Sequence, residues 1–319
     1  MKPTSLYFLI LLTAGLIVSS CNESSNNRSA SDRANAVSQD FNWKTANVYF
    51  LLTDRFNKGN SETGRTDVPV ATATLRGFEG GNLKGITEKL NEGYFEDLGV
   101  DAIWMTPFVR QIDAPTDEGT GVTYGYHGYW AKDWTSLDPN FGTYDELKEL
   151  VDTAHSKGIK IVMDAVLNHT GPVTDKDPVF PEDWVRQTPP CDFSNYVGTV
   201  ECTLVANLPD IRTESTKEVE LPESLVNLWK EEGRLERELA ELDAFFTRTS
   251  LPKTPRNYLI KWLTDYVREL GIDGFRVDTT KHVDEATWAA LKQEANYAFQ
   301  AYHDEHQTKP SAPFYMVGE

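Results

Sequence analysis

Charged side chains stand at the carboxyl ends of three apolar segments of the chain. Arg276 and Asp278 occupy alternate positions of one segment, so their side chains are expected on the same side of a strand. The guanidinium of Arg276 would then keep the carboxylate of Asp278 ionised. Asp164 and Glu319 lie at the ends of the other two segments. Two carboxyl groups from neighbouring strands, one ionised and one protonated, are the groups that glycoside hydrolysis requires.

These residues also have simpler explanations when each is taken alone. Asp164 can cap a strand end, and an isolated Arg-x-Asp can be a buried ion pair. His127 lies among aromatic residues and can be a packed histidine. Several other acidic positions are interpreted as solvated surface: Asp133, Asp152 and the run over 231–241.

Five short apolar runs are expected to position the charged groups as strands. They cover residues 47–53, 100–106, 160–166, 274–278 and 314–317. Strict alternation of polar and apolar residues is missing from them, which suits strands buried on both faces. Helical patterns lie between them, over 143–158, 256–270 and 284–304. Repeated βα units of this kind predict a parallel α/β fold, either an open sheet or a barrel.

One connection is far longer than an ordinary loop. Residues 171–255 separate the third predicted strand from the helix before the fourth. This length implies a small inserted subdomain over the strand ends, with a charged helical stretch at 223–246. The parts on either side, 41–170 and 256–319, would form the body of the fold.

Composition limits the class of protein. The 319 residues include 31 Lys and Arg against 49 Asp and Glu, a formal net charge of −18, and 39% are hydrophobic. A sizeable core is therefore expected. Phosphate backbones and anionic lipids would repel such a chain, so no nucleic-acid partner is expected. A monomer acting on neutral or cationic ligands is predicted.

The first 20 residues resemble a secretory signal peptide. Lys2 precedes an apolar run that is shorter than the roughly 20 residues of a membrane span. Residues 18–21 resemble a bacterial lipobox, in which Cys21 becomes lipid-modified, although an ordinary cleaved signal is the alternative. Residues 21–40 are then a flexible tether. The protein is expected to be periplasmic or lipid-anchored to a bacterial membrane, at the outer membrane or cell surface, with no other membrane contact.

The remaining two cysteines, Cys191 and Cys202, lie in the insertion. An exported protein can keep disulfides, so the two are expected to be bridged. A total of three cysteines excludes a disulfide-dense scaffold and a four-cysteine zinc site.

Taken together, these segments resemble the alpha-amylase family, glycoside hydrolase family 13. Three of the family's four hallmark segments are present, and the fourth would lie beyond residue 319. The segments that carry the resemblance are 164–169, 271–282 and 316–319, with 99–107, 126–130 and 208–211 in support. The match covers about residues 43–319, and the long insertion with its cysteine pair is closer to the periplasmic branch.

The resemblance implies a (β/α)8 TIM barrel that is incomplete here, with about five of the eight strands and an insertion after the third. The chain is accordingly expected to be a fragment, because closure of a barrel requires the later strands. These residues alone are expected to fold poorly and to be inactive, since the family's third catalytic carboxylate is missing.

The resemblance also assigns roles to residues. Asp278 would be the nucleophile, Glu319 the general acid/base, and Arg276 the group that orients and ionises Asp278. Retention requires the two carboxyl groups to lie about 5–5.5 Å apart. Further residues would bind or stack on the sugar: His127, Tyr129, Trp130, Asp164, His169, Lys281 and His282.

The implied activity is that of a retaining, endo-acting alpha-amylase, which hydrolyses α-1,4-glucosidic bonds in starch-like glucans and maltooligosaccharides. A transglycosylase or α-glucosidase of the same family is an alternative, as is a non-catalytic sugar-binding relative. The presence of both Asp278 and Glu319 argues against the non-catalytic alternative.

A calcium ion is implied by the same resemblance. Asn168, Asp210 and the backbone carbonyl of His282 would supply oxygen ligands, which suit Ca²⁺. Residues 54–60, with Gly80 and Asn82, resemble a second calcium site that occurs in some relatives. There the ammonium of Lys58 opposes cation binding, so this second site is not expected.

Overall fold

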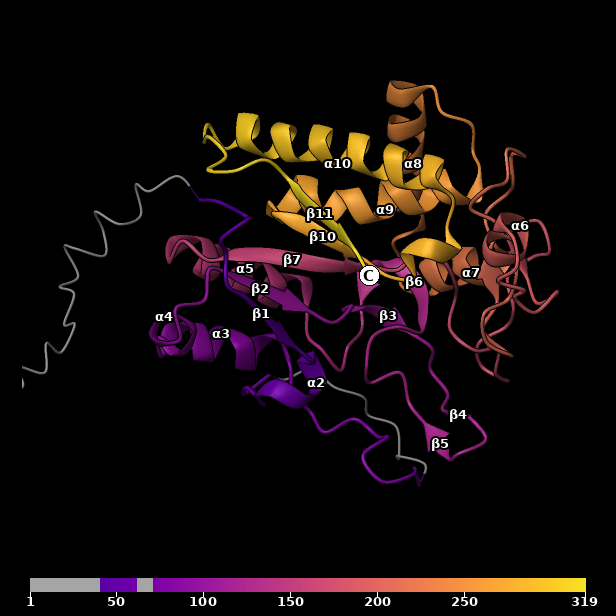
Figure 1. The fold of residues 1–319 in the computed structure, drawn as a ribbon, viewed down its shortest axis with the longest axis horizontal. Helices are drawn as coiled ribbons and strands as arrows, with labels where there is room; N and C mark the ends of the chain where they lie inside the picture. The colour runs from indigo at the N-terminus through magenta and orange to yellow at the C-terminus, as the bar shows by residue number, and fades with distance from the viewer. Residues whose placement is uncertain (1–40, 62–70) are drawn as a thin grey trace, which may run out of the picture. The chain divides into compact units, whose positions relative to one another are not determined.

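The computed structural model describes residues 41–61 and 71–319 (Figure 1). The predicted signal peptide, the tether and the lipid-modified Cys21 fall on residues 1–40, which lie outside the described residues. Within the described ranges, none of the helices combines the length and the apolar character that a membrane crossing demands.

The centre of the fold is a five-stranded sheet in the order β1-β2-β7-β10-β11. The strands are β1 (Val48–Leu51), β2 (Ala102–Met105), β7 (Lys160–Ala165), β10 (Gly274–Val277) and β11 (Tyr315–Gly318). Each neighbouring pair is parallel, as the apolar runs predict. The order follows the chain, which is the arrangement of successive βα units in a barrel.

Outside the insertion, the described α-helices are α2 (Thr53–Phe56), α3 (Leu83–Asn91), α4 (Tyr94–Asp97), α5 (Tyr144–Ser156), α9 (Pro255–Leu270) and α10 (Glu285–Glu305). Helices α3 and α4 lie near β1, and helices α9 and α10 lie near β10 and β11 (Figure 1), while Val48 and Phe50 of β1 remain exposed. The predicted capping box of α5 is present, because Thr143 accepts from the Glu146 backbone and the Glu146 carboxylate accepts in return. Helix α9 ends at Gly271, whose φ of 73° requires glycine, since a Cβ there would meet the ring of Tyr302.

Short antiparallel pairs extend from the carboxyl end of the sheet. β3 (Val109–Gln111) pairs with β6 (Ala131–Leu137), β4 (Thr116–Asp117) with β5 (Val122–Thr123), and β8 (Val185–Arg186) with β9 (Asp210–Ile211). The insertion adds α6 (Tyr196–Val200), α7 (Glu223–Glu231) and α8 (Leu235–Thr249), and the short helix η1 (Thr280–His282) follows β10. The single charged stretch expected at 223–246 is thus two helices, because Gly233 with φ of 70° separates them.

One aromatic cluster joins the insertion to the rest of the fold. The ring of Trp262 in α9 lies 6.3 Å from Trp134 in β6, 6.2 Å from Trp184 and 6.1 Å from Trp229 in α7. All four side chains are buried. The described residues, 41–61 and 71–319, belong to one compact unit, and the boundaries at 171 and 255 stay a prediction.

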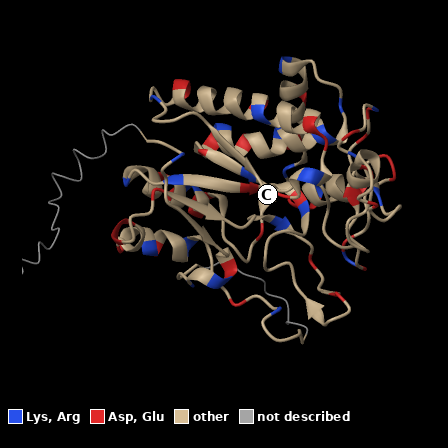
Figure 2. Ribbon diagram, viewed as in Figure 1, with Lys and Arg blue, Asp and Glu red and all other residues tan. Residues whose placement is uncertain are grey.

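Charged side chains of both signs are interspersed over the helices (Figure 2). Two acidic positions that the sequence places on the surface are nevertheless buried: Asp133 is 0% exposed and Glu238 is 3% exposed. Arg234 pairs with both, which explains how the carboxylates are accommodated. The interpretation of these two residues as solvated surface is therefore wrong.

Candidate active site

Three carboxylates meet at one guanidinium where the central strands end. Arg276 lies opposite Asp164 in the register of β10 and β7. Its Nη1 donates to Asp164 Oδ1 at 3.0 Å and to Asp278 Oδ1 at 2.9 Å, and its Nη2 lies 2.9 Å from Glu319 Oε2. Arg276, Asp164 and Asp278 are buried, whereas the side chain of Glu319 is 56% exposed. The arrangement brings together the predicted nucleophile, acid/base and orienting residues.

Burial changes the electrostatics that the sequence suggests. Desolvation raises the pKa of Asp278, the charge of Arg276 opposes this, and nearby Glu319 raises the pKa further. The pKa of Asp164 rises to about 6, again because burial outweighs Arg276. The expected effect of Arg276 on Asp278 is therefore present but does not decide the direction, since the cost of desolvation is larger.

Asp164 has two further donors. Tyr129 Oη donates to Asp164 Oδ2 at 2.8 Å, and Trp104 Nε1 donates to the same oxygen at 3.0 Å. The sequence analysis identified Tyr129 but missed Trp104. Trp104 lies in β2 opposite Val162, two positions before Asp164 in β7, so the alternation of side chains was the signal that pointed to it.

Two threonines fix Glu319, and the sequence analysis named neither. The backbone N–H of Thr279 donates to Glu319 Oε2 at 3.2 Å, and the Glu319 N–H donates to Thr280 Oγ1 at 3.1 Å. Thr279 has a φ of 48°, which is strained for a β-branched residue. The strained residue directly follows Asp278, where backbone strain frequently accompanies function.

The aromatic loop before β6 lies beside this cluster. Tyr129 N–H donates to His127 Nδ1 at 3.0 Å, and His169 Nε2 lies 3.1 Å from the Tyr129 carbonyl. Burial lowers the pKa of both His127 and His169 to about 4, so both are neutral at pH 7. Trp130 is buried and packs edge-to-face on His127, which suits support of the loop more than contact with a ligand.

Lys281 and His282 face the insertion. His282 Nδ1 lies 2.9 Å from the Thr199 carbonyl, and the ring of Phe193 lies 5.7 Å from the His282 ring. Thr199 and Phe193 belong to a loop that a disulfide between Cys191 and Cys202 closes. The two sulfur atoms approach His282 but are bonded to each other, so this group does not form a zinc site.

The three predicted calcium ligands also converge. The amide oxygen of Asn168 faces two acceptors, Asp210 Oδ2 at 3.3 Å and the His282 carbonyl at 3.1 Å. A reversed amide would donate to both, but a cation among the three oxygens satisfies them equally well. Asp210 Oδ1 is buried, accepts no hydrogen bond, and lies 3.3 Å from Arg186 Nε as a buried ion pair. The oxygen-only set, with the Asn168 oxygen facing two other acceptors, fits a hard cation such as Ca²⁺.

The loop after β1 does not fit a second ion. Asp54 accepts from the backbone N–H groups of Glu79 at 2.9 Å and Gly80 at 3.1 Å, and it pairs with Arg55. The amide oxygen of Asn82 is likewise taken by backbone donors. The oxygens that a cation would need are already used.

Comparison with known proteins agrees with this geometry. The family model "Alpha amylase, catalytic domain" matches residues 50–316. The periplasmic alpha-amylase of Escherichia coli (strain K12) is 34% identical, over 89% of this chain and 48% of that protein. A cyclomaltodextrin glucanotransferase of Bacillus licheniformis is 32% identical, over 79% of this chain and 33% of that protein.

Solved structures give the same result. The alpha-amylase of Geobacillus thermoleovorans, complexed with acarbose, superposes with a TM-score of 0.58 at 28% identity, over 87% of this chain and 47% of that one. An Anoxybacillus alpha-amylase superposes with a TM-score of 0.59 at 27% identity, over 87% and 48%. The chain thus spans about half the length, or less, of these relatives. The chain belongs to the alpha-amylase catalytic domain family of glycoside hydrolases, and its described residues form an incomplete barrel of that family, with five parallel strands.

Proposed function

We propose that the protein is a retaining, endo-acting alpha-amylase that cleaves α-1,4-glucosidic bonds in starch-like glucans and maltooligosaccharides. The observation that supports this proposal is the convergence of Asp164, Asp278 and Glu319 on Arg276. Membership of the family and the similarity to a periplasmic alpha-amylase agree with it.

The chemistry follows from the positions of the two acids. The ionised Asp278 attacks the anomeric carbon while Glu319 gives its proton to the departing glycosidic oxygen, which leaves a glycosyl ester on Asp278. Glu319 then removes a proton from water, and the resulting hydroxide displaces Asp278 from the sugar. Arg276 supports the first step, since its Nη1 lies 2.9 Å from Asp278 and stabilises the ionised form.

The remaining predicted residues are proposed to hold the sugar. Tyr129 presents its ring beside the cluster, and the neutral imidazoles of His127 and His169 are suited to hydrogen bonds with hydroxyl groups. Trp130 supports this loop. Asp164, held by donors of its own, would accept from sugar hydroxyls. His282 would also bind the sugar beside the scissile bond, and Lys281 would lie on the leaving-group side.

Transglycosylation is the second candidate, because a cyclomaltodextrin glucanotransferase is 32% identical. The glycosyl ester on Asp278 would then be attacked by a sugar hydroxyl in place of water. Product analysis with maltoheptaose and the full-length protein separates the two. Shorter linear products, released first as the α-anomer in proton NMR, are expected. Cyclic or longer products would reject hydrolysis, and β-anomers would reject retention.

We further propose that Asn168, Asp210 and the His282 carbonyl hold a calcium ion. The ion would join the insertion to the strand ends, because its ligands come from both. Removal of calcium with EGTA is expected to lower the thermal unfolding midpoint, and added Ca²⁺ to restore it. An Asp210→Asn variant whose midpoint still responded fully to EGTA would contradict this assignment.

Export is proposed as well, with lipid attachment at Cys21. The similarity to a periplasmic alpha-amylase supports export. Labelling with a radioactive or alkyne-bearing fatty acid tests the lipid, since Cys21→Ser would abolish incorporation.

A further inference from the structure

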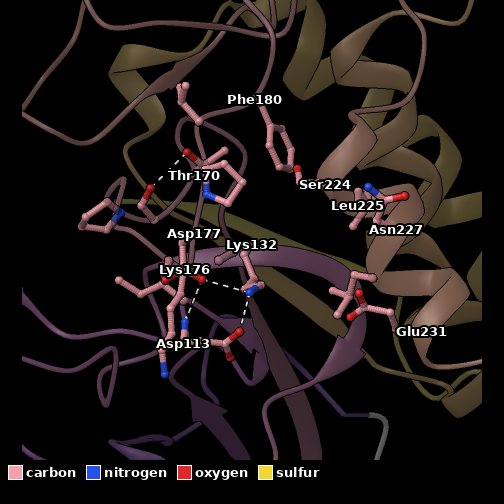
Figure 3. Close-up of a pocket in the computed structure, with 17 residues that line it drawn as sticks. Asp113, Lys132, Thr170, Lys176, Asp177, Phe180, Ser224, Leu225, Asn227 and Glu231 are labelled. Carbon is pink, nitrogen blue, oxygen red and sulfur yellow. Dashed lines mark hydrogen bonds and ion pairs between the residues drawn. The ribbon is translucent and has the colours of Figure 1, made fainter. Parts of the chain in front are cut away.

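A pocket of about 280 Å³ lies between Lys132 and Asp177 on one side and helix α7 on the other (Figure 3). Its walls are the end of β3, the start of β6, residues 170–172, residues 176–180 and one face of α7. Its volume is near the lower end of the range for small-molecule pockets, about 300–1,000 Å³. None of the residues assigned above to catalysis, sugar binding or calcium lines it.

One side of the pocket is a fixed ionic group. Lys132 Nζ donates to Asp113 Oδ2 at 2.7 Å and to Asp177 Oδ1 at 2.9 Å. The Asp177 carboxylate also accepts from the backbone of Asp113 at 2.9 Å and of Ala114 at 3.0 Å. The lysine charge is therefore neutralised and the carboxylate oxygens of Asp177 are engaged. This side has little attraction for an anion and no open set of oxygens for a metal ion.

The opposite side offers free hydrogen-bonding groups. Ser224, Asn227 and Glu231 lie at spacings of three and four along α7, which places them on one helix face. Figure 3 shows them across the pocket from Lys132 and Asp177. Within the described part of the chain, these three side chains make no hydrogen bond or ion pair with another residue. They are available to a ligand that donates and accepts several hydrogen bonds.

Most of the remaining lining is apolar, with Thr170 and Lys176 as its polar members. Pro172, Phe180, Leu225 and Leu228 border the pocket, and Phe180 and Leu225 are otherwise buried. A ligand that fits must present C–H groups to these side chains and hydroxyl groups to α7. A sugar ring has this division, with apolar faces and a polar edge. Asn227 and Glu231 are exposed and therefore hydrated in the free protein, and the hydroxyl groups of a bound sugar would replace that water.

We propose that this pocket is a second carbohydrate-binding site, distinct from the candidate active site, which takes one or two hexose units. The use of an α-glucan as the probe rests on the proposed function, whereas the lining itself calls only for a neutral sugar.

The pocket also touches the backbone that carries the active-site loop. Ile112 N–H donates to the Trp130 carbonyl at 3.0 Å, and Gly171 N–H donates to the Ala131 carbonyl at 2.7 Å. Both donors lie in the pocket wall. Their acceptors directly follow Tyr129 in the chain. A sugar bound here contacts the reverse side of the segment that presents Tyr129 to the substrate.

The test separates this pocket from the cleft by first weakening the cleft. In the full-length protein, Tyr129→Ala removes the proposed contact between the Tyr129 ring and the sugar in the cleft. Maltose binding to this variant is then measured by calorimetry. We expect Tyr129→Ala to bind maltose still. Adding Asn227→Trp, which fills the pocket, is expected to abolish that binding. Adding Lys230→Trp, an equally large change at an exposed residue outside the pocket lining, is expected to leave it unchanged.

A milder variant guards against misfolding. In the Tyr129→Ala background, Ser224→Ala with Asn227→Ala is expected to weaken maltose binding roughly tenfold, through the loss of two hydrogen bonds. The proposal is overturned if Tyr129→Ala binds no maltose, or if the Asn227→Trp addition leaves its binding intact. Absence of glucan hydrolysis with the expected maltose results would instead reject the proposed function and leave the pocket assignment standing.

Discussion

Two buried cations in this protein each hold several carboxylates, yet only one of them lies where chemistry is expected. Arg276 holds its three acids at the ends of the central strands, and one of the three, Glu319, is largely exposed. Lys261 in α9 holds Glu241 at 2.9 Å and Asp265 at 2.6 Å on the outer face, between helices.

The Arg276 group and the Lys261 group each contain an aspartate with a raised pKa. The pKa of Asp164 beside Arg276 and that of Asp265 beside Lys261 both rise to about 6, in each case because burial outweighs the neighbouring cation. A shifted pKa therefore does not distinguish the sites. The distinguishing features are the position at strand ends, the exposed acid and the strained backbone at Thr279.

The two groups are expected to differ most in kcat when one carboxylate charge is removed from each. Asp278→Asn is expected to lower the kcat of the full-length protein on maltoheptaose by a factor of about 10⁴ or more, because the nucleophile is lost. Maltotriose binding should persist. Asp265→Asn serves as the matched control and should keep near-normal kcat. Equal losses in both variants would show that the charge matters for folding and not for chemistry.

Lys261 supplies the second largest effect. Lys261→Met removes the shared partner of Asp265 and Glu241, whose side chains are 21% and 36% exposed, while Asp265 keeps Arg268. The expected cost is about 2–3 kcal/mol of unfolding free energy, below that of breaking a fully buried pair. Urea denaturation of the full-length protein measures this loss. The kcat of the folded fraction should change little. A loss below about 1 kcal/mol would mean that the pair is solvated and contributes as a surface ion pair does.

These two groups also show what the sequence can and cannot reveal. The apolar runs predict the five strands, and the alternation of Arg276 and Asp278 predicts their common side, because both depend on local periodicity. Lys261 and Asp265 read as an ordinary i,i+4 pair on a helix surface. The burial of Lys261 depends on how α8, the preceding helix, folds back against α9 and brings Glu241 to Lys261, which the spacing along α9 alone does not reveal.

The same distinction applies within the candidate site. Trp104 reaches Asp164 only once β2 and β7 are in register, and the strained φ of Thr279 is a property of the folded turn. The direction of the pKa shift at Asp278 depends on how much water the fold excludes. Residue types and spacing identify the groups that we propose to react, whereas tertiary packing sets their donors and their charge.

The Lys261 group is also expected to make the unfolding free energy depend on pH, through Asp265. The pKa of Asp265 in the folded state, about 6, lies above its ordinary value of 3.8 because of burial, although Lys261 and Arg268 oppose the rise and Glu269 adds to it. The protonated carboxyl therefore favours the folded state. This contribution is complete below pH 3.8 and is lost as the pH rises through 6.

Asp265→Asn removes this titration. Relative to the parent, its unfolding free energy should rise by about 1–3 kcal/mol between pH 4 and pH 7. Urea midpoints across this range measure the difference. Asp164 titrates in both proteins and cancels. A constant difference at all pH values would contradict the raised pKa of Asp265.

A last pair of variants tests whether Trp104 positions the Arg276 group. Trp104→Phe keeps most of the ring but removes one of the donors to Asp164 Oδ2, while Tyr129 and Arg276 remain. The loss of one hydrogen bond to a charged group corresponds to about 1.5–3 kcal/mol, or roughly 10- to 100-fold in kcat/KM. Phe50→Leu, which removes the ring packed on Trp104 without touching a donor, is the control. If Trp104 has only a structural role, both variants should have a lower unfolding midpoint and an unchanged kcat/KM per folded molecule. If Trp104 positions the Arg276 group, kcat/KM should change in Trp104→Phe alone.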